Sequence, residues 1–336
     1  MTQKTYVIAD PLDCLVHDRL REHLSHMKEL TLDEALREEY IDVVWSLHII
    51  ARKLYGIKCG IKNIIDGKGK LTIINKHLMH DALRDRGGEM YLAKTRLLRD
   101  FVNEVKNKRA NVSARAPVII RPIGAHMCSG RGIRITASEN ELYRAAKFYE
   151  AGKVERFRFE RVIASEYITD IMTHADSKFH VRMYLLIHHP SDRLGFISTF
   201  CKVGVVMTAK KLYKQSDYAN SRIHDTHGAT TARNLYFPDA LNLDPAIYSA
   251  FCAHIDKITA IFGDIMRGNT ALFSEQKYGF EVFGVDLLIK PDGCPIIMEC
   301  NNGVGYGPLV YDEGFAHHSA EYFDWIYDVV LRHYID

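Results

Sequence analysis

The sequence predicts a mixed fold in which helices and strands share layers, either α+β or α/β, and three observations support this. Amphipathic stretches with apolar residues three and four positions apart alternate with short runs of β-branched and aliphatic residues. The chain has 336 residues, enough for two or three compact subdomains with a large core. Its 47% hydrophobic and 26% charged residues exclude disordered, collagen-like and coiled-coil proteins.

Helices are expected where apolar residues recur on one helical face. The first covers 36–55, where Leu36, Tyr40, Val43 and Leu47 fall on one side. Ser138 and a glutamate three residues later form a helix-start signal, which predicts a helix at 139–151. The other expected helices cover 76–86, 91–108, a stretch within 245–266, and 315–334.

Strands are expected where short apolar runs are bounded by turn residues. Residues 66–69 have the composition of a turn that precedes a strand at 71–74. A buried strand at 118–120 ends at Arg121-Pro122 and leads into a glycine-rich loop at 124–132. The remaining expected strands cover 133–135, 161–167, 181–188, 203–207, 281–289 and 295–300.

The last two of these strands are expected to form a hairpin. Asp292-Gly293 is a strong signal for a two-residue turn, in which Pro291 opposes Cys294. Counting back along both strands in that register places Asp286 directly opposite Glu299.

This hairpin gathers oxygen-bearing side chains on one face of the sheet. Asn301 projects from the same face as Glu299, two residues further on. The carboxylates of Asp286 and Glu299 would repel each other unless a cation neutralises them, and Mg²⁺ favours such oxygen ligands. Two solvated carboxylates beside a turn are the alternative, but the apolar strands around them favour a metal.

A series of short motifs follows in a defined order along the chain. They are Asn75-Lys76, Ile119-Ile120-Arg121-Pro122, Gly130-Arg131-Gly132-Ile133, Ala164-Ser165-Glu166-Tyr167-Ile168, Lys178-Phe179-His180-Val181-Arg182-Met183-Tyr184, His224-Asp225-Thr226-His227, Phe283-Gly284-Val285-Asp286 and Glu299-Cys300-Asn301. Together, from about Trp45 to Tyr311, they resemble the tubulin–tyrosine ligase-like family of the ATP-grasp superfamily.

The resemblance implies an ATP-grasp fold of the α+β class with three subdomains. They are an N-terminal subdomain (1–75), a central one with the phosphate loop (76–165) and a C-terminal one with the magnesium strands (166–336). The nucleotide would bind between two mainly antiparallel sheets.

The resemblance also implies ATP and Mg²⁺ as cofactors and assigns roles to individual residues. Asp286, Glu299 and Asn301 would hold the metal, with Glu299 also catalytic. Arg182 would face the transferring phosphoryl group, and Arg222 would hold the acceptor's carboxylate or acyl phosphate. The implied nucleotide-binding residues are Lys76, Arg121, Arg131, Gly132, Glu166, Ile168, Lys178, His180 and Thr226.

Three positions depart from the family pattern. Arg121 replaces a lysine, and these two cations are not interchangeable at a shaped site. His180 replaces an acid that would contact the nucleotide, and His227 replaces the asparagine after Thr226. The chain is therefore expected to be a divergent relative, whose activity need not match that of any one branch.

The implied activity is an ATP-dependent carboxylate–amine ligase. It would add an amino acid (Tyr, Glu or Gly) to a protein or peptide, such as a tubulin tail, through an acyl phosphate. One alternative is an ATP-grasp kinase or a ligase of peptides or small molecules. Another is a non-catalytic module that binds nucleotide or tubulin.

Charge along the chain suggests an acidic acceptor. The formal net charge is only +2, yet residues 51–134 contain 19 Lys and Arg against 6 Asp and Glu, a net +13. A solvated basic face is one interpretation. The other is a surface that steers ATP and an acidic polypeptide, which predicts salt-sensitive binding.

Other sequence features concern the compartment and the excluded partners. The 7 cysteines are scattered and contain no C-x-x-C pair, which favours a reducing compartment and a cytoplasmic protein. No apolar run approaches the roughly 20 residues of a membrane helix, so no membrane partner is expected. The aromatic residues form no stacking motif, so no nucleic-acid partner is expected either.

Overall fold

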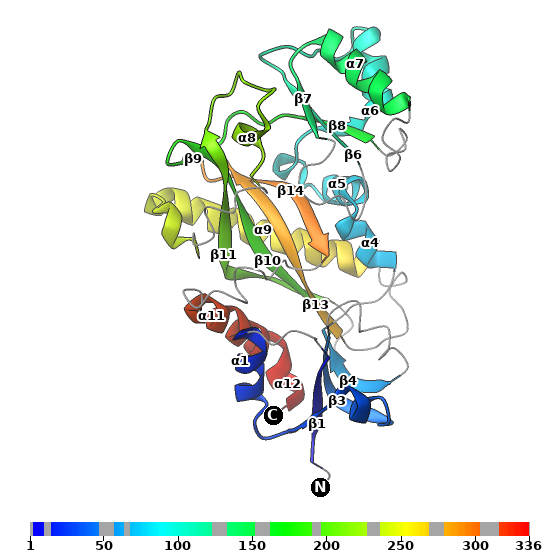
Figure 1. Ribbon diagram of the computed structural model, residues 1–336, viewed down its shortest axis with the longest axis vertical. Coiled ribbons are helices and arrows are strands. Elements are labelled where there is room, and N and C mark those ends of the chain that lie inside the picture. Colours follow the sequence, from blue (N-terminus) through cyan, green and yellow to red (C-terminus); the bar gives the residue numbers. More distant parts are fainter. Residues whose placement is uncertain are drawn as a thin grey trace.

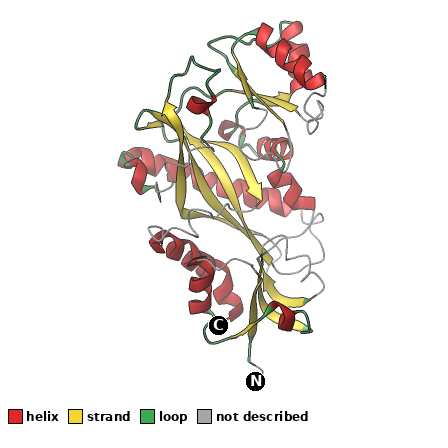
Figure 2. Cartoon of the chain, viewed as in Figure 1, coloured by secondary structure: helices red, strands yellow, loops and turns green. Residues whose placement is uncertain are grey.

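The computed structural model is a mixed α and β protein with three sheets arranged along its long axis (Figure 1). The larger antiparallel sheet lies in the middle, between a parallel sheet near the termini and a small antiparallel sheet at the far end (Figure 2). This agrees with the predicted α+β class. The residues that the structure describes are 3–9, 15–46, 57–63, 68–122, 133–151, 162–189, 196–226, 236–268, 279–302 and 316–335.

The N-terminal sheet is parallel, with strand order β2-β1-β3-β4. Its elements are β1 (Thr5–Ala9), α1 (Leu15–His23), β2 (Lys28–Leu30), α2 (Leu32–Ala35), β3 (Tyr40–Ser46) and β4 (Lys58–Lys62). The helix predicted over 36–55 is wrong across β3, and residues 47–56 lie outside the described part. Ile41, Val43, Val44 and Trp45 are all buried. A strand covered on both faces has apolar residues at nearly every position, and such a run also satisfies a helical spacing.

The small antiparallel sheet has strand order β5-β8-β6-β7. Its strands are β5 (Thr95–Leu97), β6 (Val118–Pro122), β7 (Arg134–Thr136) and β8 (Val162–Glu166), and α6 (Leu98–Lys106) and α7 (Glu139–Glu150) pack on it. Ser138 caps α7 as predicted, since its side chain accepts a hydrogen bond from the Glu141 N–H at 3.3 Å. The helix predicted over 91–108 begins only at Leu98, because residues 95–97 pair with β8.

The large sheet has strand order β12-β11-β10-β13-β14, with β9 beside β10. Its strands are β9 (Thr173–His174), β10 (Ser177–His189), β11 (Ile197–Leu212), β12 (Tyr236–Phe237), β13 (Gly279–Ile289) and β14 (Pro295–Asn302). All its pairings are antiparallel. The short helix α8 (Ser221–His224) lies near the end of β11 (Figure 1).

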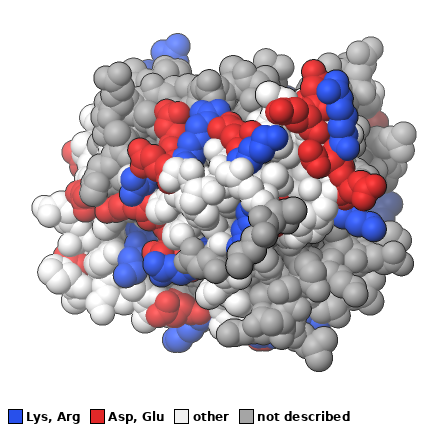
Figure 3. All heavy atoms as spheres, turned by 90° about the horizontal axis from the view of Figure 1, so that it is seen from below, with Lys and Arg blue, Asp and Glu red and all other residues white. Residues whose placement is uncertain are grey.

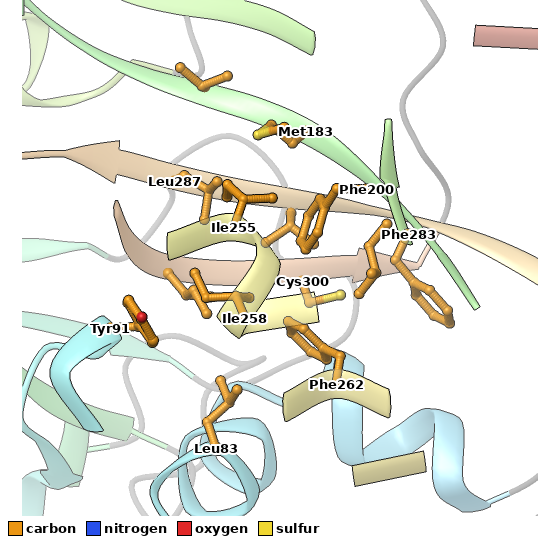
Figure 4. Packing of buried hydrophobic residues seen from close by; sticks show 14 of the residues in the cluster. Leu83, Tyr91, Met183, Phe200, Ile255, Ile258, Phe262, Phe283, Leu287 and Cys300 are labelled. Atoms are coloured by element: carbon orange, nitrogen blue, oxygen red, sulfur yellow. The ribbon is translucent and has the colours of Figure 1, made fainter. Parts of the chain in front are cut away.

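One face of the large sheet is covered by α9 (Pro245–Gly268), the long helix predicted within 245–266. Ile255, Ile258 and Phe262 of this helix pack with Phe283 and Leu287 of β13, as Figure 4 shows. The helix α5 (Lys76–Arg84) adds Met79 and Leu83 to the same core. This face is apolar except at Glu281, which alternation along β13 places on it and which forms a buried ion pair with Lys70.

The opposite face of the large sheet is apolar at its two ends and polar between them. Phe280 and Val282 pack beneath α11 (Ala316–Ile326) and the helical turns that follow it, Tyr327–Leu331 and α12 (Arg332–Ile335). Leu288 packs with a separate small cluster. Because side chains alternate along a strand, Gly284 and Asp286 occupy the interval between these two clusters on the same face.

Residues 68–74 form a helix, α4 (Lys68–Ile74), so the strand predicted at 71–74 is wrong. A short apolar run does not by itself distinguish a strand from a buried helix. Here Ile73 is buried in the main core, while Lys70 forms a buried ion pair with Glu281 of β13. This pair fixes α4, and with it the start of α5, against the large sheet.

The end of the molecule near the two termini carries both signs of charge. Figure 3 shows acidic and basic side chains intermingled on this face, and Arg19 pairs with Asp324 while Arg21 pairs with Glu29. The described part of the chain contains no helix with the length and apolar character needed to cross a bilayer.

Candidate functional site

Asp286, Glu299 and Asn301 meet on the polar interval of the large sheet. Asp286 pairs with Glu299 across β13 and β14, as predicted. The Asn301 amide donates hydrogen bonds to Asp286 Oδ2 at 3.2 Å and to Glu299 Oε1 at 3.1 Å. The three side chains thus form one cluster of oxygen-rich groups, in which Asp286 is fully buried.

The turn and the register of this hairpin differ from those predicted, although the Asp286–Glu299 pairing is the same. The two-residue turn predicted at Asp292-Gly293 is wrong, because Ile289 pairs with Pro295 and leaves a longer turn. Gly293 adopts φ +83°, and a Cβ there would lie 2.7 Å from the Ile247 carbonyl oxygen. Glycine is therefore required at this turn position.

A β-bulge corrects the register that the longer turn would otherwise shift. Leu287 pairs with Ile297 and Asp286 with Glu299, so Met298 is the extra residue of β14. Met298 packs beside Leu288 and Ile296 in the small apolar cluster next to the site. Without the bulge, the turn would place Met298 opposite Asp286.

Two cations hold the carboxylates. Arg182, opposite Asp286 on β10, donates from Nε at 2.7 Å and from Nη2 at 2.8 Å to the two carboxylate oxygens. Burial alone would lower the pKa of Arg182, but the charge and hydrogen bonds of Asp286 outweigh burial and raise it. Lys76 Nζ lies 2.5 Å from Glu299 Oε2. The first turn of α5, which begins with Lys76, is capped by Asn75, whose side chain accepts from the His77 N–H at 3.0 Å.

Arg121 adds a third cation at the end of β6. Its Nη2 donates to Ser165 Oγ at 3.3 Å, whereas its buried Nε has no hydrogen-bond acceptor among the described residues. Burial lowers the pKa of Arg121, and the nearby charge of Glu299 opposes this effect. A buried N–H without an acceptor is costly unless a ligand supplies one.

Lys178 is the fourth cation, almost fully buried on β10. Its Nζ donates to Tyr167 Oη at 3.0 Å and lies 4.4 Å from the centre of the Tyr167 ring. Burial and the charge of Arg121 lower the pKa of Lys178 to about 7, although Asp225 opposes the shift. Its positive charge is therefore only weakly compensated by the protein.

His180 and Thr226, both predicted to contact the nucleotide, instead contact each other. His180 Nδ1 lies 2.6 Å from Thr226 Oγ1, and His180 Nε2 lies 3.8 Å from Asp286 Oδ1. Both residues are buried. The histidine at the position of the family's acid thus lies beside the carboxylate cluster and bonds to Thr226.

The remaining predicted site residues lie around this centre or outside the described part. Glu166 ends β8 with an exposed side chain, and its N–H donates to the Lys94 carbonyl oxygen at 2.9 Å. Ile168 is half-buried and Arg222 on α8 is exposed. Arg131, Gly132 and His227 lie outside the described residues.

Two residues that contact the site were assigned no role from the sequence, although both occur in the family motifs. They are Tyr167, which lies within the expected hinge motif, and His224, which begins the His-Asp-Thr-His motif. Tyr167 Oη lies 2.7 Å from His224 Nδ1. Their place within the motifs could have indicated a role, because a buried tyrosine or histidine usually has a hydrogen-bond partner.

The donor set fits a hard divalent cation that shares its ligands with a polyphosphate. The two carboxylates carry the oxygen ligands that Mg²⁺ prefers, and the Asn301 amide, whose nitrogen here donates to both carboxylates, would offer its oxygen to a bound ion. In the described ranges, no group of three or more His, Cys, Asp or Glu able to hold a metal is found. Lys76, Arg121, Lys178 and Arg182 surround the donor set with positive charge.

Comparison with known proteins identifies the family of part of the chain. Residues 65–224 match the model of the tubulin-tyrosine ligase family. This confirms the resemblance predicted from the motifs, and the matched stretch contains Lys76, Arg121, Lys178 and Arg182. No curated protein matches the chain.

Proposed function

We propose that this tubulin–tyrosine ligase-like chain is an ATP-dependent ligase that modifies a protein or peptide. The observation that carries the proposal is the arrangement of Asp286, Glu299 and Asn301 on one sheet face, surrounded by cations from α5, β6 and β10. This charge pattern suits a triphosphate with its Mg²⁺. The family match supports ligase activity.

We further propose that the fold is an ATP-grasp fold with the subdomains 1–75, 76–165 and 166–336. The parallel, small and large sheets fall in these intervals in order, apart from one residue of β8. The nucleotide would bind between the small sheet and the polar interval of the large sheet. Backbone groups near Glu166 and Ile168 would meet the adenine, and Arg131 and Gly132 would contribute to the phosphate loop.

In the proposed reaction, Asp286, Glu299 and Asn301 would hold Mg²⁺, which neutralises phosphate charge. Arg182 would then stabilise the phosphoryl group in transit, because its planar guanidinium matches spread negative charge. A carboxylate oxygen attacks the γ-phosphorus and the bond to ADP breaks, which yields an acyl phosphate and ADP. An amine nitrogen then attacks the acyl carbon, loses a proton and expels inorganic phosphate, leaving an amide.

We propose an acidic polypeptide as acceptor, for example a tubulin tail, with Tyr, Glu or Gly as the amino acid added. Residues 51–134 contain 19 basic and 6 acidic residues, and this positive charge supports an acidic acceptor. Arg222, exposed on α8, is the proposed contact for a carboxylate or acyl phosphate. A cytoplasmic location is also proposed, because Cys59, Cys201, Cys252, Cys294 and Cys300 are free thiols.

The test measures ADP release with purified protein, ATP, Mg²⁺, single amino acids and acidic peptides, and identifies the products by mass spectrometry. The expected result is ADP release that requires both an amino acid and a peptide, with a product heavier than the peptide by one amino acid less one water. Glu299→Gln should abolish turnover, whereas Glu150→Gln, an exposed carboxylate at the end of α7, should not. Wild-type turnover by Glu299→Gln would contradict the metal assignment.

A nucleotide-binding module without turnover is the second candidate. The observation that favours it is the bond between His180 and Thr226, two residues expected to contact the substrates. Nucleotide binding with no ADP release across a panel of acceptors would support it. The same experiment separates an ATP-grasp kinase, whose product gains phosphate instead of an amino acid, and a cyclising ligase of peptides or small molecules, whose product loses water.

A further inference from the structure

A chain of hydrogen bonds runs from a backbone carbonyl in the loop before α8 to the Lys178 ammonium. His224 Nε2 lies 2.8 Å from the Asp217 carbonyl oxygen, His224 Nδ1 lies 2.7 Å from Tyr167 Oη, and Lys178 Nζ donates to Tyr167 Oη at 3.0 Å. The three side chains are all buried, with 8%, 4% and 5% of their surface exposed for His224, Tyr167 and Lys178.

The direction of every bond in this chain is fixed by chemistry. A carbonyl oxygen only accepts, so His224 carries its proton on Nε2 and offers Nδ1 as an acceptor. Tyr167 therefore donates its hydroxyl proton to His224, and its oxygen accepts from Lys178. Burial lowers the pKa of His224 and raises that of Tyr167, which keeps the imidazole neutral and the phenol protonated.

Aromatic packing holds the chain in place. The Tyr167 ring meets the His224 ring edge-on at 5.5 Å, and the Tyr218 ring stacks on His224 at 6.0 Å. Tyr167 follows the last strand of the small sheet, whereas Lys178 lies on the large sheet and His224 on α8. The chain thus spans both sheets that flank the proposed nucleotide site.

We propose that Tyr167 and His224 are positioning residues that hold the Lys178 ammonium for an anionic nucleotide. The proposal rests on the nucleotide-binding role of Lys178 under the proposed function. Tyr167 supplies the oxygen that Lys178 contacts, and His224 fixes the direction of that oxygen's lone pairs. The charged groups that face Lys178 are Arg121 from β6 and Asp225 from the segment after α8.

The positioning role has a consequence for pH dependence. Nucleotide phosphates favour the charged form of Lys178, so affinity should fall as the pH rises above about 7, where the free protein loses this proton. Removing the Tyr167 hydroxyl takes away an acceptor that favours the ammonium. The pKa of Lys178 then falls further, and the loss of affinity begins at lower pH.

The experiment measures binding of the non-hydrolysable analogue β,γ-imido-ATP with Mg²⁺ by calorimetry between pH 6 and 9. Tyr167→Phe should weaken binding about tenfold at pH 7 and move the decline to lower pH. His224→Ala should also weaken binding of the analogue. His224→Asn should bind more tightly than His224→Ala, because the Asn Oδ1 lies near the position of the His Nδ1 and can accept the Tyr167 hydroxyl proton. Tyr218→Phe, whose hydroxyl bonds the Ala114 carbonyl oxygen at 3.3 Å instead, should match the wild type.

A double-mutant cycle separates positioning from general damage to the fold. If Tyr167 acts through Lys178, Tyr167→Phe should add nothing to Lys178→Met. Additive losses, or an unchanged pH profile in Tyr167→Phe, would overturn the proposal while leaving the proposed function intact. NMR titration of the Lys178 side chain gives a readout without nucleotide, and an equal pKa in wild type and Tyr167→Phe would overturn the proposal as well. Failure of the wild type to bind the analogue would instead refute the proposed function, and the nucleotide role of Lys178 with it.

Discussion

The Arg182–Asp286 pair permits a test of burial, because the chain contains a surface pair of matching geometry. Arg182 donates two hydrogen bonds to Asp286, at 2.7 and 2.8 Å, from side chains that are 13% and 0% exposed. Arg19 donates two hydrogen bonds to Asp324, at 3.0 and 3.1 Å, from side chains that are 37% and 40% exposed. Each carboxylate also has a histidine nearby.

Asp286→Ala should lower the free energy of unfolding by about 3–5 kcal/mol, because it leaves a buried guanidinium without its counter-charge. Asp324→Ala should cost about 0.2–1 kcal/mol, since water screens the exposed pair and solvates the remaining arginine. Replacing both buried partners together, Arg182→Met with Asp286→Leu, should recover most of the loss, because no uncompensated charge then remains.

The assay is urea denaturation with EDTA and without nucleotide, followed by circular dichroism and the fluorescence of Trp45 and Trp325. EDTA removes any contribution of a divalent cation to the wild type. A loss below about 1 kcal/mol for Asp286→Ala, or equal losses at the buried and surface pairs, would refute the reasoning. So would a double variant that is no more stable than Asp286→Ala.

Three further predictions concern stability and pH. Gly293→Ala should cost at least about 1–2 kcal/mol, more than Gly87→Ala, which has a similar φ of +76° but nothing within 4 Å of an added Cβ; equal losses in urea denaturation would contradict the clash with the Ile247 carbonyl. Burial lowers the pKa of His80 to about 4, so the neutral histidine stabilises the fold above pH 6.5, and this stabilisation is lost as the pH falls toward 4. In His80→Leu, the urea concentration at the unfolding midpoint should therefore change less between pH 7 and 4.5 than in the wild type. Hydrogen bonds from its arginine and histidine partners lower the pKa of Asp324 despite partial burial, so its stabilisation is present above pH 3.8 and disappears as the pH falls through the lowered value; Asp324→Asn should remove this part of the acid-induced fall in Tm, and an unchanged slope below pH 4 would count against it.

Which two strands pair at the centre of the candidate site could be predicted because this depends on a local signal, whereas the Asp286–Glu299 register is correct only because the bulge offsets the longer turn. The turn residues near Gly293 and the apolar runs on both sides determine which strands pair, and the distance along the chain is short. The bulge at Met298 could not be predicted in the same way. It compensates a turn that is one residue longer than expected, and Met298 itself is apolar like its strand neighbours.

The errors in secondary structure have a common cause. Residues 40–46 and 71–74 are short apolar segments whose state depends on what covers them, and the sequence does not display its tertiary neighbours. Parallel pairing with β1 and β4 makes the first segment a strand. Packing of Ile73 in the main core and the Lys70–Glu281 pair accompany the helical state of the second.

The cluster of positive side chains was predicted from motifs, but its internal partners were not. The sequence suggested His180 as a ligand contact, whereas the structure has it bonded to Thr226. The bonds of His180 with Thr226 and of Tyr167 with His224 join residues more than 40 positions apart, and no periodic pattern encodes them. Tyr167 and His224 belong to two separate motifs, and only the distance between their side chains indicates a joint role.

The ion pairs of Lys76 with Glu299 and of Arg182 with Asp286 neutralise both carboxylates of the centre before any ligand binds. The carboxylates therefore need no metal ion to compensate their charge when the chain folds. Ligand binding at this centre would then replace both ion pairs: the cations would pair with phosphate, and the carboxylates would bind the divalent ion. Phosphate alone would leave the carboxylates without a counter-charge, and the divalent ion alone would leave the cations without one. The polyanion and the metal ion should therefore bind at this centre together, as a complex.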